Sequence, residues 1–317
     1  VLFLAPAISL NITDFRVANA TEPSVFSQAL PGYVYRFPED FYSHDDFRIE
    51  WWYYTGNLEE VATSRSFGYQ LTFFRVALDR ISGNPNPSKW KVGHIYFAHM
   101  TLSDIAGEKF YYFERINRKG IGNAGADSQR LMVWNEDWSL EGKDNEHLLE
   151  AVESGTGIKL QLAPEKKLVV HGQDGISKKG SEAGNASHYF SYTRMKTSGT
   201  VFVDGKSYKV FGTSWMDHEY SSNQLNNELS GWDWFSLKLD DQTELMLYQL
   251  RRKSGGIDSF SSGTFVSSDG VSRHIKRDEF TVESSAQWRS KQSGITYPAG
   301  WKLSLPDLGI KLRISPD

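Results

Sequence analysis

Short segments rich in aromatic and β-branched residues recur along this chain and are separated by turn residues, which is the feature that most constrains its fold. Five of them follow one another between residues 131 and 171, at 131–134, 138–141, 148–152, 158–162 and 168–171. A repeat of about ten residues with turns between the segments is typical of antiparallel β-sandwiches and β-barrels. No long amphipathic helical pattern accompanies them. The pattern therefore predicts an all-β protein.

The same pattern predicts strands on both sides of this region. Asp204-Gly205 is a hairpin turn signal between two of them. An all-β chain with little helix protects its strand edges by closing into barrels, and a barrel of about eight strands can hold one small ligand. We therefore predict two antiparallel, lipocalin-like (calycin) β-barrel domains. The further strands are expected at residues 45–58, 66–75, 94–104, 110–115, 188–195, 200–203, 208–211, 231–239, 243–251, 263–267, 280–282, 301–304 and 310–314.

Two aromatic hairpins support this division into two domains. Residues 51–54 (WWYY) resemble residues 232–235 (WDWF), and residues 69–71 (YQL) match residues 248–250 (YQL). Such self-similarity indicates two related β domains, although a shared pattern of strand residues is an alternative explanation. The prediction is an irregular N-terminal lead-in at residues 1–35, a first barrel at 36–195 and a second barrel at 196–317.

Composition excludes several classes of function. The chain has 317 residues with 35 basic and 39 acidic side chains, and without a basic patch we expect no nucleic-acid partner. It has no Cys, so disulfides, thiolate nucleophiles and Cys-based metal sites are absent. No apolar run approaches the roughly 20 residues of a transmembrane helix. The apolar residues 1–10 could be the end of an export signal or a short strand. We expect a periplasmic or secreted protein, with a cytoplasmic one as the alternative.

The stretch from Gly212 to Ser222 carries the strongest chemical signal, because Asp217, His218 and Glu219 are consecutive there. In a strand, side chains alternate between faces. Trp215, Asp217 and Glu219 would then share one face, while Met216, His218 and Tyr220 share the other. Ionisable groups in an aromatic setting form either a hydrogen-bonded structural network or an active site, and both interpretations stay open.

Several longer motifs stand out at residues 47–56, 67–75, 191–194, 215–219 and 231–235. Together they resemble the AttH-like family, and the resemblance runs from about residue 36 to the end. Members of this family are often described as predicted secreted hydrolases and are related to hydroxyneurosporene synthase (carotenoid hydratase). It implies two lipocalin-like domains and a role with lipids or isoprenoids. Fold alone does not choose between the chemistries that such a family supports.

Two motifs depart from those of the hydratases of this family. Their motif runs Asp-His-Asn-Trp with a Tyr-x-Asp on a following strand, whereas this chain has Asp217-His218-Glu219-Tyr220 and Tyr248-x-Leu250. If the missing Asp is the proton donor to an alkene, then Glu219, Asp217 or Asp233 must replace it. We therefore do not expect carotenoid hydration specifically.

The first functional hypothesis is an enzyme that acts on a lipophilic substrate by acid–base chemistry, such as hydration, isomerisation or cyclisation. A carboxylic acid kept protonated in a dry aromatic site can protonate an alkene, and aromatic rings can stabilise a carbocation. Asp217 or Glu219 would be the acid and His218 its partner or the base, with Tyr248 completing the candidate catalytic set. The candidate ligand-binding residues, which could instead simply fill barrel cores, are Glu50, Trp52, Tyr54, Gln70, Trp215, Tyr220, Trp232, Asp233 and Trp234.

Two alternatives remain. The protein could be a carrier that binds a lipid or isoprenoid without turnover. It could also be a secreted hydrolase, although no His-Glu-x-x-His motif is present and Ser181 lacks the closing Gly of a Gly-x-Ser-x-Gly motif. His94 and His99 are five residues apart and fall on opposite strand faces. We expect a hydrophobic small-molecule partner, no metal and no cofactor, and the sequence leaves the oligomeric state open.

Overall fold

The computed structural model describes residues 26–78, 92–119, 122–223, 228–291 and 293–316. The chain divides between residues 225 and 226 into two compact units. Helix in the described residues is limited to the 3₁₀ turns η2 (Glu39–Phe41), η3 (Arg277–Glu279) and η4 (Pro306–Leu308). The all-β prediction is therefore confirmed. Residues 1–10, with their expected export signal or strand, lie outside the described ranges.

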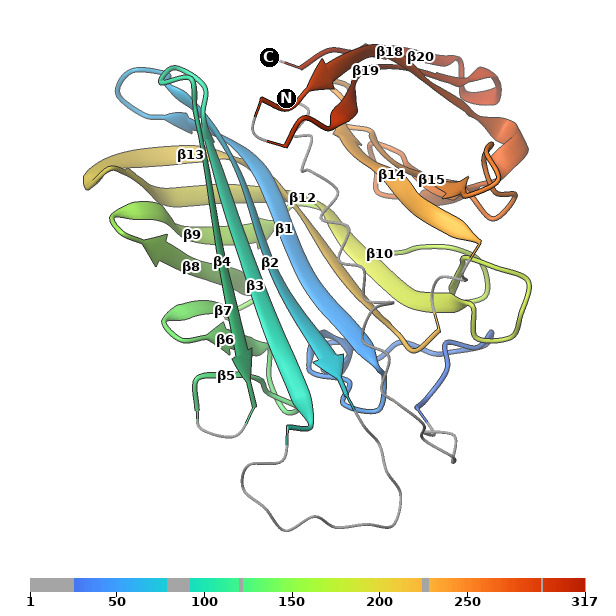
Figure 1. Ribbon diagram of the computed structural model, residues 1–317, viewed down its shortest axis with the longest axis horizontal. Helices are drawn as coiled ribbons and strands as arrows, with labels where there is room; N and C mark the ends of the chain where they lie inside the picture. The colour runs from blue at the N-terminus through green and yellow to red at the C-terminus, as the bar shows by residue number, and fades with distance from the viewer. Residues whose placement is uncertain (1–25, 79–91, 120–121, 224–227, 292, 317) are drawn as a thin grey trace. The chain divides into compact units, whose positions relative to one another are not determined.

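The first unit is built on one antiparallel sheet (Figure 1). Along the sheet the strands follow the order β4-β3-β2-β1-β13-β12-β9-β8-β7-β6-β5, and the short β10 and β11 also pair with β12. The strands are β1 (Ile49–Glu60), β2 (Ser66–Ala77), β3 (His94–Asp104), β4 (Lys109–Arg118), β5 (Ala124–Ala126), β6 (Met132–Asn135), β7 (Trp138–Lys143), β8 (Glu146–Glu153), β9 (Thr156–Pro164), β10 (Val169–Val170), β11 (Ser177–Lys178), β12 (Ala186–Val203) and β13 (Lys206–Ser221).

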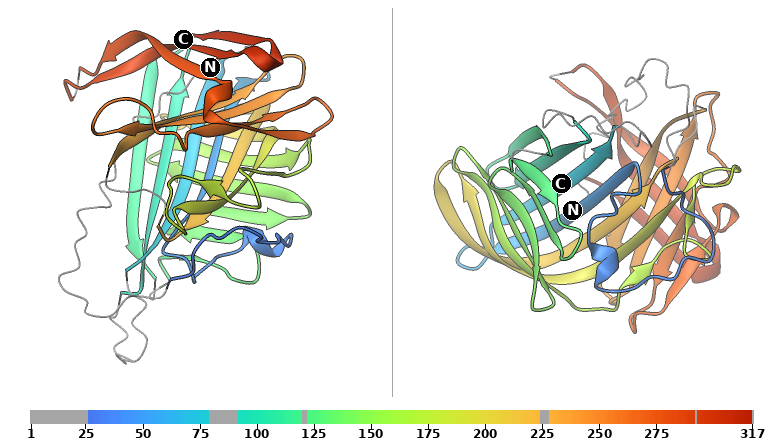
Figure 2. Two further views of the ribbon diagram at one scale, coloured as in Figure 1. Left: turned by 90° about the vertical axis from the view of Figure 1, so that its right-hand side faces the viewer. Right: turned by 90° about the horizontal axis from the view of Figure 1, so that it is seen from below.

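The sheet curls into a nearly closed, lipocalin-like barrel, as the right-hand view of Figure 2 shows. Side chains join its two ends, because Asn135 on β6 reaches both β3 and β4. Asn117 Nδ2 donates to Asn135 Oδ1 at 2.8 Å, and Asn135 Nδ2 donates to the Tyr96 carbonyl at 3.3 Å. Arg115 Nη1 donates to the Asn135 carbonyl at 3.0 Å. These bonds satisfy polar groups that a closing sheet would otherwise bury unpaired.

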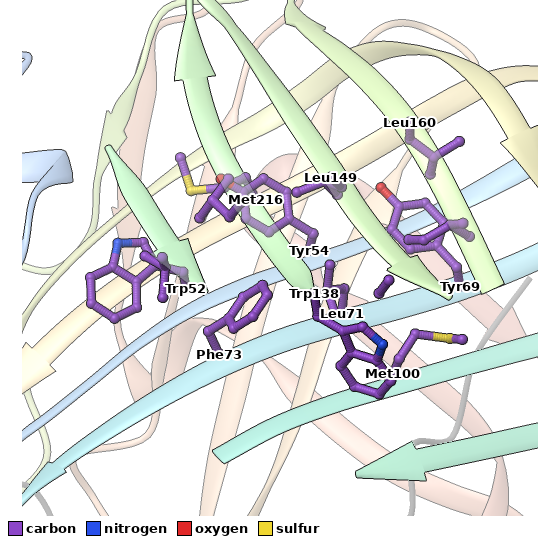
Figure 3. Packing of buried hydrophobic residues seen from close by; sticks show 14 of the residues in the cluster. Trp52, Tyr54, Tyr69, Leu71, Phe73, Met100, Trp138, Leu149, Leu160 and Met216 are labelled. Atoms are coloured by element: carbon purple, nitrogen blue, oxygen red, sulfur yellow. The ribbon is translucent and has the colours of Figure 1, made fainter. Parts of the chain in front are cut away.

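Packed apolar and aromatic side chains line the lumen of the barrel and form its core (Figure 3). Alternate residues of β1 point inwards, so Trp52 and Tyr54 are buried while Trp51 and Tyr53 are only partly buried. Tyr54 Oη lies 2.7 Å from Nδ1 of His147 on β8, across the lumen. The alternation predicted for this strand thus places one face in the core.

The segment before β1 contains no strand among its described residues, 26–48, so the strand predicted from residue 45 begins four residues later, at Ile49. It is nevertheless tied to the barrel. The Trp52 indole donates to the Phe41 carbonyl at 3.1 Å, and Phe41 belongs to the lumen core. This segment therefore brings its polar side chains to the first residues of β1.

The second unit contains two antiparallel sheets with a shared core in its described residues. Phe235 and Leu245 of the first sheet belong to the same buried cluster as Trp301 and Leu303 of the second. Closure of this unit into a second barrel stays a prediction. The first sheet contains β14 (Leu229–Lys238), β15 (Glu244–Arg252), β16 (Ser262–Val266) and β17 (Ser272–Ile275), and the second contains β18 (Thr281–Arg289), β19 (Thr296–Leu305) and β20 (Ile310–Ile314).

The predicted boundary between residues 195 and 196 falls inside β12. That strand continues to Val203 and pairs with β9 and β13 on both sides of the boundary. Its register shifts between Tyr192 and Met195, which marks a β-bulge. The predicted turn at Asp204-Gly205 is present, with φ of 49° and 80°, and it joins β12 to β13 within the first unit.

Candidate active site on the outer face of β13

The strand β13 carries ionisable groups on both of its faces. Its register with β1 pairs His218 with Trp52 and Asp217 with Tyr53. Since Trp52 points into the lumen, Met216, His218 and Tyr220 form the lumen face of β13. Trp215, Asp217 and Glu219 form its outer face. The motif therefore contributes to two separate clusters, one on each side of the barrel wall.

Asp217 is the centre of the outer cluster and is 4% exposed. Its Oδ1 accepts hydrogen bonds from Trp215 Nε1 at 2.7 Å, from Tyr189 Oη at 3.0 Å and from Ser191 Oγ. Burial nevertheless raises the pKa of the Asp217 carboxyl to about 7, because the three donors do not offset the loss of water and the nearby Glu219 raises the pKa further. With the described donors all on Oδ1, Oδ2 is the oxygen that can hold the proton.

His171 supports one of these donors. Its Nε2 lies 2.7 Å from Ser191 Oγ, and its ring centroid is 4.2 Å from that of Tyr189. The His171 backbone N–H also donates to the Tyr189 carbonyl at 2.9 Å. Because Ser191 gives its hydroxyl proton to Asp217, it accepts from His171. Two donors to Asp217 are thus held in place by one imidazole.

Glu219 lies two residues further along the same face, which separates the two side chains by about 7 Å along a strand. Lys179 Nζ is 3.5 Å from Glu219 Oε1, and Ser187 Oγ donates to the same oxygen. Lys179 and Glu219 are almost fully buried. The outer face therefore holds two carboxyl groups in different surroundings, one with neutral donors and one in an ion pair.

Glu50 is the centre of the lumen cluster and is fully buried. Its carboxylate lies 2.8 Å from His44 Nδ1, 2.9 Å from His218 Nε2 and 2.9 Å from Arg75 Nε. Burial favours the neutral acid, but the Arg75 guanidinium and the two imidazoles hold the pKa of Glu50 well below its usual range. Burial also lowers the pKa of His218. The lumen side of the motif is therefore an ionised Glu with a neutral His218 beside it.

Asp40 extends this cluster towards the end of the barrel. It accepts from Tyr220 Oη at 2.9 Å and from Tyr33 Oη at 2.5 Å, and it lies 3.4 Å from His44 Nε2. Although burial raises the pKa of Asp40, these bonds outweigh it and bring the value to about 2. His44 lies between two carboxylates, which raise its pKa despite its burial.

Among the described residues, His44, Glu50 and His218 bring together a donor set that could hold a metal ion, with ligand atoms within 4.8 Å of one another. Ligand atoms around a tetrahedral Zn²⁺ with bonds of about 2.0–2.1 Å are roughly 3.3 Å apart. Here both imidazole nitrogens are at hydrogen-bond distance, 2.8 and 2.9 Å, from one Glu50 oxygen. The cluster as it stands is therefore a hydrogen-bonded network, and an ion would have to spread it.

Comparison with known proteins identifies the family. The AttH-like family model matches residues 28–317. The chain belongs to the AttH-like family. A crystal structure from Nitrosomonas europaea, described provisionally as AttH, is 32% identical with a TM-score of 0.80, over 88% of this chain and 84% of that one. Kievitone hydratase from Nectria haematococca has the same fold at 14% identity and a TM-score of 0.61, over 89% of this chain and 81% of that chain. A search of curated proteins found no match.

The predicted site residues of this AttH-like chain fall into three groups. Glu50, Trp52, Tyr54, His218 and Tyr220 lie on the lumen side, while Gln70, Trp215, Asp217 and Glu219 lie on the outer side. Gln70 Nε2 donates to Tyr53 Oη at 3.0 Å. Trp232, Asp233, Trp234 and Tyr248 belong to β14 and β15 of the second unit.

The second-unit candidates have partners within their own sheet. Arg251 Nη1 donates to Asp233 Oδ1 at 2.5 Å, and Ser262 Oγ donates to Tyr248 Oη at 2.8 Å. Trp232 is 47% exposed.

The described residues contain no helix long and apolar enough to cross a membrane.

Sequence reasoning missed the partners that define both clusters. Arg75 could have been found, because the β1–β2 hairpin register pairs it directly with Glu50. His44 and Asp40 precede the first strand, and His171 and Lys179 lie in or beside short strands that pair with β12. No motif or spacing connects these residues to Asp217 or His218 in the sequence.

Proposed function

We propose that this AttH-like protein adds water to, or removes water from, a double bond of a lipophilic small molecule, using Asp217 and Glu219 on the outer face of β13. The observation that carries the proposal is the pair of carboxyl groups on one strand face with opposite surroundings. A buried carboxyl group with neutral donors and a carboxylate held beside a cation can divide the roles of acid and base. Asp217 is the acid, and the ion-paired Glu219 is the base.

In the hydration direction, Asp217 gives its Oδ2 proton to one carbon of the double bond. The bonds from Trp215, Tyr189 and Ser191 to Oδ1 stabilise the carboxylate that forms. Water then adds to the cationic carbon and loses a proton to Glu219. In inverting glycosidases, two carboxyl groups about 6.5–9.5 Å apart leave room for an attacking water, and the spacing of about 7 Å expected here meets that requirement.

The surroundings favour an apolar substrate. Trp51 and Tyr53 on β1 pair with Glu219 and Asp217, so their rings flank the two carboxyl groups on the outer face. Aromatic faces stabilise a neighbouring cation and offer apolar contact area. An isoprenoid or other unsaturated lipid combines the double bond and the apolar body that such a site requires. The fold shared with kievitone hydratase makes hydration the first reaction to test.

The test is incubation of the purified protein with a panel of prenylated phenols, polyenes and unsaturated fatty acids in ¹⁸O-labelled water, followed by mass spectrometry. We expect a product that has gained one labelled water, and its rate should fall by about 100-fold or more in Asp217→Asn and Glu219→Gln. Asp204→Asn, which changes an exposed carboxylate, is the matched control. Binding without conversion would support a carrier instead, and cleavage of an ester in a parallel panel would support a hydrolase.

A further inference from the structure

The guanidinium of Arg75 has unused hydrogen-bond donors inside the barrel. Arg75 is fully buried, and it donates from Nε to Glu50 Oε2 at 2.9 Å. Its Nη2 donates to the carbonyls of His44 at 2.7 Å and Phe47 at 3.0 Å. Nη1 is buried with no partner. Since an Arg side chain has five N–H donors, the two on Nη1 remain unpaired on a buried atom.

The hydroxyl of Tyr96 is a second buried donor without an acceptor, and it lies next to Arg75. Tyr96 on β3 pairs directly with Arg75 on β2, which places the two side chains side by side on the lumen face. Tyr96 is 1% exposed, and its hydroxyl lies near the Ala126 amide, which is a donor, so the hydroxyl proton itself has no acceptor. His94 Nδ1, two residues before Tyr96, is also buried and unpaired, at 3.7 Å from Asp45.

Unpaired buried polar atoms are rare in native proteins, and each needs an explanation such as a bound molecule. Among the described residues, six side-chain atoms are of this kind. Three of them, on Arg75, Tyr96 and His94, lie at one end of two paired strands. A fourth, His218 Nδ1, belongs to a ring bonded to the same Glu50 as Arg75. This concentration points to one missing partner with hydrogen-bonding capacity.

The charges around Arg75 define the chemistry of that partner. The guanidinium is already balanced by Glu50 at 2.9 Å, with Asp45 a further 3.8 Å contact, and Asp45 is in turn paired with Lys119 at 3.0 Å. A carboxylate or phosphate would add a negative charge that no free cation of this group compensates. An uncharged oxygen can accept from Arg75 Nη1 and Tyr96 Oη without disturbing the balance.

We propose that the Arg75 end of the lumen binds the carbonyl oxygen of a small uncharged lipophilic molecule, such as a ketone, aldehyde or ester, through Arg75 Nη1 and Tyr96 Oη. This site is distinct from the outer acid pair, because both residues belong to the lumen face of the sheet. It does not depend on the proposed hydration, and it gives the barrel a binding role of its own.

The test uses Tyr96→Phe, with Tyr54→Phe as the matched control. Both tyrosines are buried in the lumen, but Tyr54 Oη is already bonded to His147 Nδ1 at 2.7 Å. Without ligand, thermal unfolding should show an unchanged or higher Tm for Tyr96→Phe, because an unpaired hydroxyl is removed, and a lower Tm for Tyr54→Phe, because His147 loses its partner. A lower Tm for Tyr96→Phe comparable to that of Tyr54→Phe would overturn the proposal.

Binding is measured by calorimetry and by the chemical shift of carbonyl-¹³C 2-nonanone, with nonanoate as the charged match. We expect 2-nonanone to bind at least tenfold more tightly than nonanoate, and Tyr96→Phe to weaken ketone binding at least tenfold. Equal binding by Tyr96→Phe, tighter binding of nonanoate, or no ketone binding at all would overturn the site. An ordered water on Arg75 and Tyr96 that the ketone does not displace in a crystal would overturn it as well.

Discussion

Asp217 and His218 are neighbours in the chain, yet they belong to different chemical environments on the two sides of the barrel wall. Asp217 Oδ1 is bonded to Trp215 Nε1 at 2.7 Å on the outer face, while His218 Nε2 is 2.9 Å from Glu50 Oε1 in the lumen. A direct proton exchange between the two side chains would have to pass through the sheet. His218 is therefore not the base that serves Asp217, and Glu219 on the same face takes that place in our account.

Replacing Asp217 by Asn should change how stability depends on pH. The carboxyl ionises near 3.8 in the unfolded chain and near 7 in the folded one. Between these values the unfolded state binds fewer protons, so the wild-type protein loses stability as pH rises from about 4 to about 7. The difference corresponds to on the order of 4 kcal/mol. Urea unfolding measures this effect: over this pH range the free energy of unfolding of Asp217→Asn should rise relative to that of the wild type. A difference in unfolding free energy that stays constant across pH would contradict the account.

Removing the partner of Glu219 should destabilise the protein strongly. Lys179→Met removes a cation from beside the buried Glu219 carboxylate, and breaking a buried ion pair costs on the order of 3–5 kcal/mol in comparable sites. Lys159→Met is the control, because the Lys159–Glu150 pair is about half exposed and should contribute less than about 1 kcal/mol. Denaturant unfolding at neutral pH measures both. Equal, small losses in the two variants would show that Lys179 is not needed to hold Glu219.

Asp40 should contribute stability that acid removes. Its pKa is about 2 in the folded state against 3.8 in the unfolded one, so the contribution is complete above about pH 4 and is lost as pH falls towards 2. The shift corresponds to on the order of 2 kcal/mol. Asp40→Asn should therefore be less stable than the wild type at pH 7. The difference in the free energy of unfolding between the two proteins should shrink as the pH falls. A gap that persists undiminished at the lowest pH would mean that the ionised form of Asp40 is not what stabilises the fold.

Local patterns predicted most of the strands of this fold, for physical reasons that individual elements illustrate. The Asp204-Gly205 turn adopts positive φ at both residues, so the hairpin between β12 and β13 was visible in the sequence. The alternation of residues 215–220 likewise follows from strand geometry alone. Such features depend on neighbours in the chain and need no knowledge of the tertiary structure.

The domain boundary and the site partners depend on long-range pairing instead. Residues around 195 suggest a strand end, but β12 only bulges there and continues to Val203. Ser191 reaches Asp217 because β12 and β13 pair in one specific register. Lys179 reaches Glu219 from beside β11, a two-residue strand. Patterns of residue type cannot supply these registers, so the sequence indicated an acid site without its donors or its ion pair.

The most direct test of the central claim is the protonation of Asp217 in the folded protein. Infrared difference spectra across a pH titration detect the C=O stretch of a protonated carboxyl, and Asp217→Asn assigns the band. Our account predicts a buried carboxylic acid that is present at pH 6 and is lost with a midpoint near 7, as burial on the outer face of β13 requires. A band that disappears near pH 4, or that remains in Asp217→Asn, would contradict the assignment of Asp217 as the acid.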